Sequence, residues 1–391
     1  MIVAARRTPI ATKGTRLAGL TAEELAGPVI AACTHDTASA IGSRLPIGDV
    51  VLGNCMGPGG NVARLSALAA GIDVTVPGMT IDRQCGSGLS AVITAGDAIR
   101  AGNDRLLIAG GVESASTAPT RLLDGVAYSR APFAPAGFPD PEMGPAAEAL
   151  ARAYGIDRRA QDAYAARSHR LAVAAQRLGS FDDEIVPVGG VRVDDGPRSG
   201  LASMLGRFVP LFPVPHDAPN HAGTVPTATC TATVTAGNSC RISDGAAAVA
   251  LVPSRRRGGA PGLALTAHAT IGCDPALPGI GPVGAVARVL DVAGVSLADV
   301  AAFEIVEAFS AQALAVLRLL GLANDDEVDD RVCAGGGALA LGHPWGASGA
   351  VGVVRLFSRL VRGGAPAGSL GIATAAIGGG MGVAALFEVV R

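Results

Sequence analysis

The order of secondary-structure signals in the first part of the chain recurs near its end, and this repeat constrains the fold more than any other feature. A short apolar run (49–56) is followed by a Gly/Ser-rich helix start (85–92) and by an apolar run that ends at glycines (105–114). Comparable segments follow in the same order at 299–309, 342–354 and 370–382. Buried strands that alternate with helices are typical of α/β proteins. The repeat predicts two related halves that face each other, with helix N-termini from both halves directed at one seam.

Composition narrows the class of protein. A chain of 391 residues is long enough for two or three packed domains. The formal net charge is -2, and the absence of a basic stripe argues against a nucleic-acid partner. Seven cysteines without metal-binding spacing predict free thiols in a reducing cytoplasm and no metal site. The N-terminus, MIVAARRTPI, shows no signal peptide, so we expect a cytoplasmic protein.

One apolar segment is long enough to be mistaken for a membrane span. Residues 369–390 contain a single charge. The run Gly378–Gly380 lies at the centre of this segment, where it would break a helix. Glycine runs are instead typical of tight turns. The segment therefore predicts two buried strands joined by a turn, and no membrane partner.

The middle of the chain differs in composition from both halves. Residues 118–232 are rich in proline and contain one clearly helical stretch, 148–179. Residues 210–232 have the irregular proline and histidine pattern of a loop. We expect this region to be an insertion that lies over the seam, where a substrate-binding cover is common.

Cys85 lies between a β-branched run and the Gly/Ser helix start, and two interpretations are open. Most free cysteines are small buried hydrophobic residues. A thiol at a helix N-terminus is instead exposed to amides and a helix dipole that lower its pKa. Gly86 and Gly88 would let a ligand approach the backbone, and a strand-to-helix turn presents its side chain, as in a nucleophile elbow.

His343 lies at the equivalent place in the second half, before another Gly-Ala-Ser-Gly helix start. A single histidine is usually a structural residue, and that interpretation applies to the other histidines of the chain. Because the two halves face each other, a neutral imidazole at residue 343 could remove the proton of Cys85. The repeat thus predicts a Cys85–His343 pair across the seam.

These stretches also carry a family resemblance. The chain resembles the thiolases, the acyl-CoA C-acyltransferase family of condensing enzymes, in ordered motifs along nearly its whole length, among them DRQCGSGLSAV, AGGVESAS, TVTAGN, VEAF, GGALALGHPWGASGA and IGGGMGVAALFE. The resemblance implies an α/β fold of duplicated five-layer α-β-α-β-α type with an inserted loop domain. It implies an N-terminal half at 1–117 and 240–262, a coenzyme A-binding loop domain at 118–239 and a C-terminal half at 263–391.

The resemblance also implies roles for individual residues. Cys85 matches the nucleophile that becomes acylated, and His343 matches the histidine that activates it. The backbone amides of Cys85 and Gly378 match the oxyanion hole. The residues that match the lining of the substrate site, around the pantetheine and the acyl group, are Met143, Ala236, Cys240 and Phe309. The implied substrate is acyl-CoA, with no further cofactor and no metal, and the implied assembly is a homodimer or homotetramer.

The chain departs from the family pattern at positions that concern carbon–carbon chemistry. Ala376 stands where the family has an acid/base cysteine, and Val306 where it has an asparagine of a second oxyanion hole. Arg241 follows Cys240 where the family often has Ser-Gly. Cys333, close to His343 in sequence, is either a substitute acid/base group or a core thiol.

The resulting expectation is a thiolase-type acyl-CoA C-acyltransferase with an acyl-cysteine intermediate, acting in thiolysis of 3-oxoacyl-CoA or in condensation of acyl-CoA. Two alternatives remain at this point. One is a thiolase-like acyltransferase or hydrolase that lacks the Claisen step because of Ala376 and Val306. The other is a non-catalytic scaffold that binds coenzyme A.

Overall fold

The secondary structure alternates as the sequence predicts. The computed structural model describes residues 1–212, 232–325 and 327–391. The strands are β1 Ile2–Arg7, β2 Ala11–Thr12, β3 Ile47–Gly53, β4 Gly78–Ile81, β5 Leu106–Glu113, β6 Arg121–Leu123, β7 Val126–Tyr128, β8 Ser243–Leu251, β9 Gly262–Gly272, β10 Val300–Ile305, β11 Leu370–Ile377 and β12 Met381–Val390. The helices are α1 Ala22–Ile41, α2 Val62–Ala69, α3 Ser87–Arg100, α4 Met143–Ala153, α5 Arg158–Arg177, α6 Gly281–Ala293, α7 Ser310–Leu319, α8 Ala338–Leu341 and α9 Trp345–Leu356.

The sheet order repeats between the two halves. The strands follow one another as β10-β11-β12-β9-β1-β8-β5-β3-β4, and among the described strands the two half-sheets are paired through Ile2 of β1 and Leu263 of β9. In the first half β3 and β5 are parallel, while β8 is antiparallel to both β5 and β1. In the second half β10 and β11 are parallel, while β12 is antiparallel to both β11 and β9. The predicted duplication is therefore confirmed at the level of strand topology.

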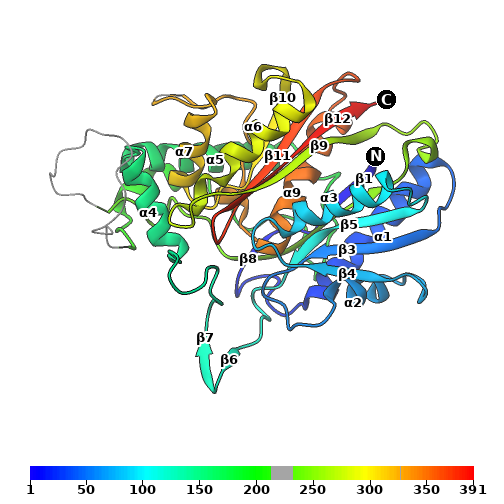
Figure 1. The fold of residues 1–391 in the computed structure, drawn as a ribbon, viewed down its shortest axis with the longest axis horizontal. Helices are drawn as coiled ribbons and strands as arrows, with labels where there is room; N and C mark the ends of the chain where they lie inside the picture. Colours follow the sequence, from blue (N-terminus) through cyan, green and yellow to red (C-terminus); the bar gives the residue numbers. More distant parts are fainter. Residues whose placement is uncertain (213–231, 326) are drawn as a thin grey trace.

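Helices α3 and α9 form the central layer. Both helices contact strands of both halves, while α1 and α2 cover the first half and α6 covers the second (Figure 1). The hairpin of β6 and β7 projects away from the body of the molecule (Figure 1). This arrangement confirms the predicted duplicated α-β-α-β-α fold and places the N-termini of α3 and α9 at the seam.

Glycines bring the two central helices into direct backbone contact. A Cβ atom added to Gly88 of α3 would lie 2.8 Å from the carbonyl oxygen of Gly346 in α9. A Cβ atom added to Gly53, at the end of β3, would lie 2.6 Å from the same oxygen. Since real Cβ atoms are not found at such distances, only glycine permits this approach.

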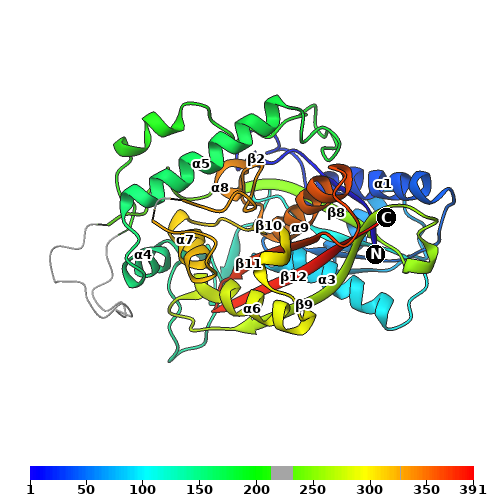
Figure 2. The same cartoon turned by 90° about the horizontal axis from the view of Figure 1, so that it is seen from above.

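The described part of the inserted region contains two α-helices, α4 and α5, where the sequence predicts one. The expected helix over 148–179 is wrong because the chain breaks between α4 and α5: Gly155 adopts a left-handed φ of 60°. Asp157 then caps α5 by accepting a hydrogen bond from the amide of Ala160 at 2.7 Å. Helix α5 packs against α7 and lies alongside α8 (Figure 2). Most of the loop predicted at 210–232, including Cys230, lies outside the described residues, and the domain boundaries stay predictions.

The apolar C-terminal segment forms two strands, as predicted. Strand β11 pairs along its whole length with β12, and the two are joined by the turn Gly378–Gly380. Gly379 and Gly380 have φ values of 84° and 81°, which side chains disfavour. In the part of the chain that the structure describes, no helix combines the length and apolarity needed to cross a bilayer.

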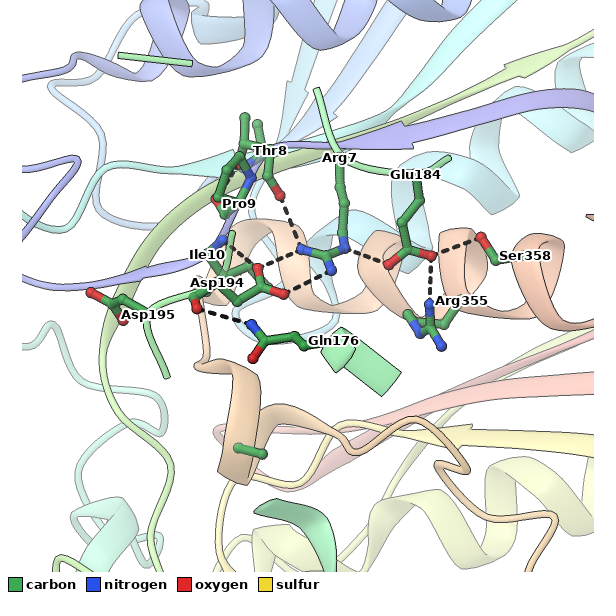
Figure 3. Close-up of polar contacts among 12 residues, drawn as sticks. Arg7, Thr8, Pro9, Ile10, Gln176, Glu184, Asp194, Asp195, Arg355 and Ser358 are labelled. Carbon is green, nitrogen blue, oxygen red and sulfur yellow. Dashed lines mark hydrogen bonds and ion pairs between the residues drawn. The ribbon is translucent and has the colours of Figure 1, made fainter. Parts of the chain in front are cut away.

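A buried ionic network joins the inserted region to both halves (Figure 3). Arg7, at the end of β1, donates to both oxygens of Asp194 at 2.7 and 2.9 Å. Its Nε donates to Glu184 at 2.8 Å. The other oxygen of Glu184 accepts from Arg355 of α9 at 2.6 Å and from Ser358 at 2.7 Å. Arg7, Asp194 and Glu184 are buried, so each charge depends on its partners for solvation.

Candidate active site

Cys85 lies in a tight turn between β4 and α3. Helix α3 begins at Ser87 with Gly86 as its N-cap, and Gln84 adopts a left-handed φ of 47°. The hydroxyl of Ser87 accepts from the amide of Arg83 at 2.8 Å and donates to the carbonyl of Gln84 at 2.6 Å. These bonds hold the turn, and Cys85 stays half-buried at its apex. The predicted strand-to-helix turn is confirmed.

His343 lies between α8 and α9, and its Nε2 is 3.3 Å from the Sγ of Cys85. Its Nδ1 is 2.6 Å from the hydroxyl of Ser348, which donates to the carbonyl of Pro344 at 3.0 Å. Because that hydroxyl has one hydrogen, the ring must donate from Nδ1, and Nε2 carries the lone pair that faces the thiol. The predicted contact across the seam is confirmed, with the ring oriented as a proton acceptor.

Glu113 connects the two sides of the seam. One carboxylate oxygen accepts from the amides of Cys55 at 3.1 Å and Gly346 at 3.0 Å. The other accepts from the side chain of Asn54 and the amide of Met56, both at 3.0 Å. This fully buried residue ties the end of β5 to the start of α9. Neither Glu113 nor Ser348 was identified from the sequence, although both belong to motifs that were noted.

The electrostatics of the pair differ from the expected ionised thiol. Burial raises the pKa of the Cys85 thiol to about 12; its own amide opposes the rise, and the carboxylates of Glu113 and Asp82 add to it. Burial lowers the pKa of His343 to about 4. The prediction that the helix ionises the thiol is therefore wrong, because burial, together with two nearby carboxylates, outweighs the effect of the amide at the turn. The resting pair is a neutral thiol beside a neutral imidazole.

Acidification is expected to destabilise the folded protein between about pH 6.5 and pH 4. Burial lowers the pKa of both His343 and His169 to about 4, whereas an unfolded histidine has a pKa of about 6.5. Between these values the unfolded chain binds more protons, so the free energy of unfolding falls as the pH decreases. Chemical denaturation at pH 7 and pH 5 measures the fall, and a His169→Gln variant should show a smaller one. Equal stability at both pH values would contradict the neutral histidines.

Gly378 is buried at the start of the turn that follows β11. The preceding residue, Ile377, contacts the turn that carries the nucleophile: a Cβ added to Gly86 would lie 2.5 Å from its Cδ1. The end of β11 thus packs directly beside Cys85. The role of the Gly378 amide in an oxyanion hole stays a prediction.

The residues predicted to line the substrate site belong to three segments. Phe309 is the N-cap of α7 and pairs with Ser239 in an isolated bridge, next to Cys240. Met143 begins α4, and Ala236 is exposed in the segment 232–242. The amide of Thr233 donates to Glu148 of α4 at 2.5 Å, which links these last two segments.

Glu307 holds the inserted region against the second half, and it was not identified as a site residue from the sequence. Its carboxylate accepts from the hydroxyl of Tyr164 at 2.9 Å and of Ser168 at 2.7 Å, both on α5. It also accepts from the amide of Leu339 in α8 at 3.2 Å. These bonds fix α8, and with it the segment that leads to His343.

The residues that depart from the family pattern differ in how deeply they are buried. Ala376 is partly exposed on β11. Val306 is buried and lines a small pocket of about 30 Å³ together with Ser348. Cys333 is fully buried in the core, and its thiol donates to the carbonyl of Ile305 at 3.5 Å. Of its two interpretations, the structure supports the core thiol.

A thiol beside an imidazole, held at facing helix starts on a duplicated five-layer α/β fold, defines a cysteine-dependent acyl-transfer enzyme. Residues 1–255 match the family model described as the thiolase N-terminal domain, and residues 261–389 match the thiolase C-terminal domain. The chain therefore belongs to the thiolase family.

Curated relatives and a solved structure agree over the whole chain. An acetyl-CoA acetyltransferase of Chromobacterium violaceum is 40% identical over 99% of this chain and 98% of its own length. One of Pseudomonas aeruginosa is 39% identical over 98% of each chain. The crystal structure of the Bacillus anthracis acetyl-CoA acetyltransferase superimposes with a TM-score of 0.85 at 35% identity, over 100% of this chain and 98% of its own. The predicted class, a thiolase-type acyl-CoA C-acyltransferase, is confirmed, and the hydrolase and scaffold alternatives are not favoured.

Proposed function

We propose that this enzyme transfers acyl groups from acyl-CoA through an acyl-Cys85 intermediate, in thiolysis of 3-oxoacyl-CoA or in condensation of acyl-CoA. The observation that carries the proposal is the 3.3 Å contact between Cys85 Sγ and the unprotonated Nε2 of His343. A thiol is a weak nucleophile until a base removes its proton, and this geometry supplies the base.

The first step begins from two neutral groups. As Sγ attacks the substrate carbonyl carbon, the thiol proton passes to Nε2 of His343. The Nδ1–H of the ring keeps its bond to Ser348, so the imidazolium is held in place while it exists. Collapse of the tetrahedral adduct breaks the bond to the leaving group and gives the thioester on Cys85.

The negative oxygen of that adduct needs hydrogen-bond donors already in position. The backbone amides of Cys85 and Gly378 are the proposed donors. Their assignment is supported by the packing of Ile377 against Gly86, which brings the glycine turn to the nucleophile. Fixed amides require no reorganisation during the reaction.

The acyl-CoA substrate is proposed to lie against Met143, Ala236, Cys240 and Phe309. The hydrogen bonds of Glu148 and Glu307 support this assignment, because they hold the segments that carry these residues at the seam. A homodimer or homotetramer and a cytoplasmic location complete the proposal. The cysteines that the structure describes are all free thiols, which suits a reducing compartment.

Intact-mass analysis after mixing with acetyl-CoA should show one acetyl group on Cys85, and iodoacetamide should alkylate the same residue selectively. Cys33, Cys55 and Cys333 are buried, and Cys273 and Cys240 are half-buried; within the described residues neither of these two has an imidazole bond like that of Cys85. Peptide mapping locates the adducts, and a Cys85→Ser variant serves as the unreactive control. If no acetyl group is found on Cys85 after mixing with acetyl-CoA, the acyl-transfer proposal is wrong.

A further inference from the structure

Carbon–carbon cleavage or formation in this site requires a proton to move to or from carbon, in addition to the proton that His343 exchanges with Cys85. Ala376 cannot move one. The carboxylate of Glu113 accepts four N–H donors, and that of Glu307 accepts from Tyr164, Ser168 and Leu339. Cys55 is buried and donates to the carbonyl of Gln84 at 3.2 Å. Each of these groups is already engaged in holding the structure.

Cys240 lies between the two segments that frame the pair. Its amide donates to the carbonyl of Ala308 at 2.9 Å, on the loop that leads to Phe309. The carbonyl of the next residue, Arg241, accepts from the amide of His343 at 2.8 Å. Residue 240 is thus fixed by backbone bonds with the substrate loop on one side and the catalytic histidine on the other.

The side chain of Arg241 strengthens this placement. Its Nη2 donates to the carbonyl of Ala340 in α8 at 2.6 Å, so the guanidinium is bonded to α8 and the segment is held at both ends. Cys240 is a free cysteine and is half-buried. Burial raises the pKa of Cys240 to about 12, so its thiol is protonated at neutral pH.

We infer that Cys240 is the acid/base group for the carbon-centred proton transfer, an inference that rests on the proposed function. In thiolysis, Cys85 bonds to the 3-oxo carbon and the bond from that carbon to C2 breaks. The electron pair stays on C2 as the enolate of the leaving acyl-CoA, and the Cys240 thiol gives its proton to C2. The incoming coenzyme A thiol then gives its proton to the Cys240 thiolate and attacks the acyl group, and Cys85 leaves with the proton from His343.

The thiol is suited to this direction of transfer because it stays protonated at neutral pH until the enolate forms. A general acid or base in the transition state is worth about 10²–10⁴-fold in rate. Condensation runs through the same groups in reverse, with the Cys240 thiolate removing a proton from C2.

The test measures two steps separately: acetylation of Cys85, and proton transfer to or from the substrate carbon C2. For a Cys240→Ser variant we expect Cys85 still to be acetylated, because the acylation step uses His343 and not residue 240 as its base. Exchange of acetyl-CoA methyl hydrogens for deuterium in D₂O, and acetoacetyl-CoA thiolysis, should both fall by about 10²–10⁴-fold. The loss should appear chiefly in kcat, because serine keeps a polar side chain at this position of the substrate site but does not move the proton as readily as a thiol. Cys240→Ala should behave alike, and Cys273→Ser, at another half-buried thiol, should retain exchange.

Adding Ala376→Cys to the Cys240→Ser variant should restore exchange by at least roughly tenfold, because it returns a thiol to the site. Exchange within about threefold of the parent in both Cys240 variants, with normal acetylation of Cys85, would overturn the role of Cys240 alone. A parent enzyme that forms no acetyl-Cys85 would overturn the proposed function and this inference together.

Discussion

Replacing His343 with alanine should lower the rate of acyl transfer to Cys85 by about 10²–10⁴-fold, the usual contribution of a general base. The effect is expected at this residue because its Nε2 faces the thiol at 3.3 Å and the thiol is neutral at rest. Without the ring, the attacking sulfur must lose its proton to water. Stopped-flow measurement of coenzyme A release from acetyl-CoA reports the acylation rate directly.

The matched control is His35→Ala, since His35 lies on α1 with a side chain that is 81% exposed. It should acylate at the parent rate. A His343→Ala variant that is equally fast would show that the thiol does not depend on the imidazole, and the mechanism proposed above would fail.

Replacing Arg7 with methionine should reduce the free energy of unfolding by about 3–5 kcal/mol, the usual cost of removing one partner from a buried ion pair. Arg7 is fully buried and donates to both Asp194 and Glu184 (Figure 3). Asp194 would lose its ionic partner, and Glu184 would keep only Arg355. Because these carboxylates belong to the inserted region, the loss should loosen its attachment to both halves.

Denaturant unfolding of the parent and variant measures the change. The matched control is Arg288→Met, because Arg288 and Asp291 form a pair whose side chains are 61% and 70% exposed. Exposed pairs contribute about 0–1 kcal/mol, so this variant should be almost as stable as the parent. If Arg7→Met lowers the free energy of unfolding by less than about 1 kcal/mol, the buried network stabilises the fold no more than an exposed ion pair does.

The fold and the reacting pair could be predicted because their signals are local. Each half repeats an apolar strand followed by a Gly/Ser helix start, and the topology of such a repeat brings the helix starts together. Cys85 and His343 each lie just before one of those starts. Their proximity follows from the duplication, without knowledge of any individual contact.

The groups that support the pair could not be predicted, because their contacts join distant parts of the chain. Glu113 accepts from the amide of Gly346, 233 positions later. The pKa of Cys85 likewise depends on burial and on carboxylates that only the folded chain brings near it. The break before α5 could not be predicted for another reason. The sequence has a helical pattern on both sides of Gly155, and the turn between the two helices depends on the left-handed φ of that one residue.

The glycine contact between α3 and α9 leaves no room for a side chain where the two central helices meet. A methyl group on Gly88 would lie 2.8 Å from the carbonyl oxygen of Gly346, so the helices would have to move apart. Because Cys85 and His343 lie just before these two helices, such a shift would change the spacing of the reacting atoms without replacing either of them. The residues proposed to meet the acyl-CoA substrate belong to other segments and take no part in this contact.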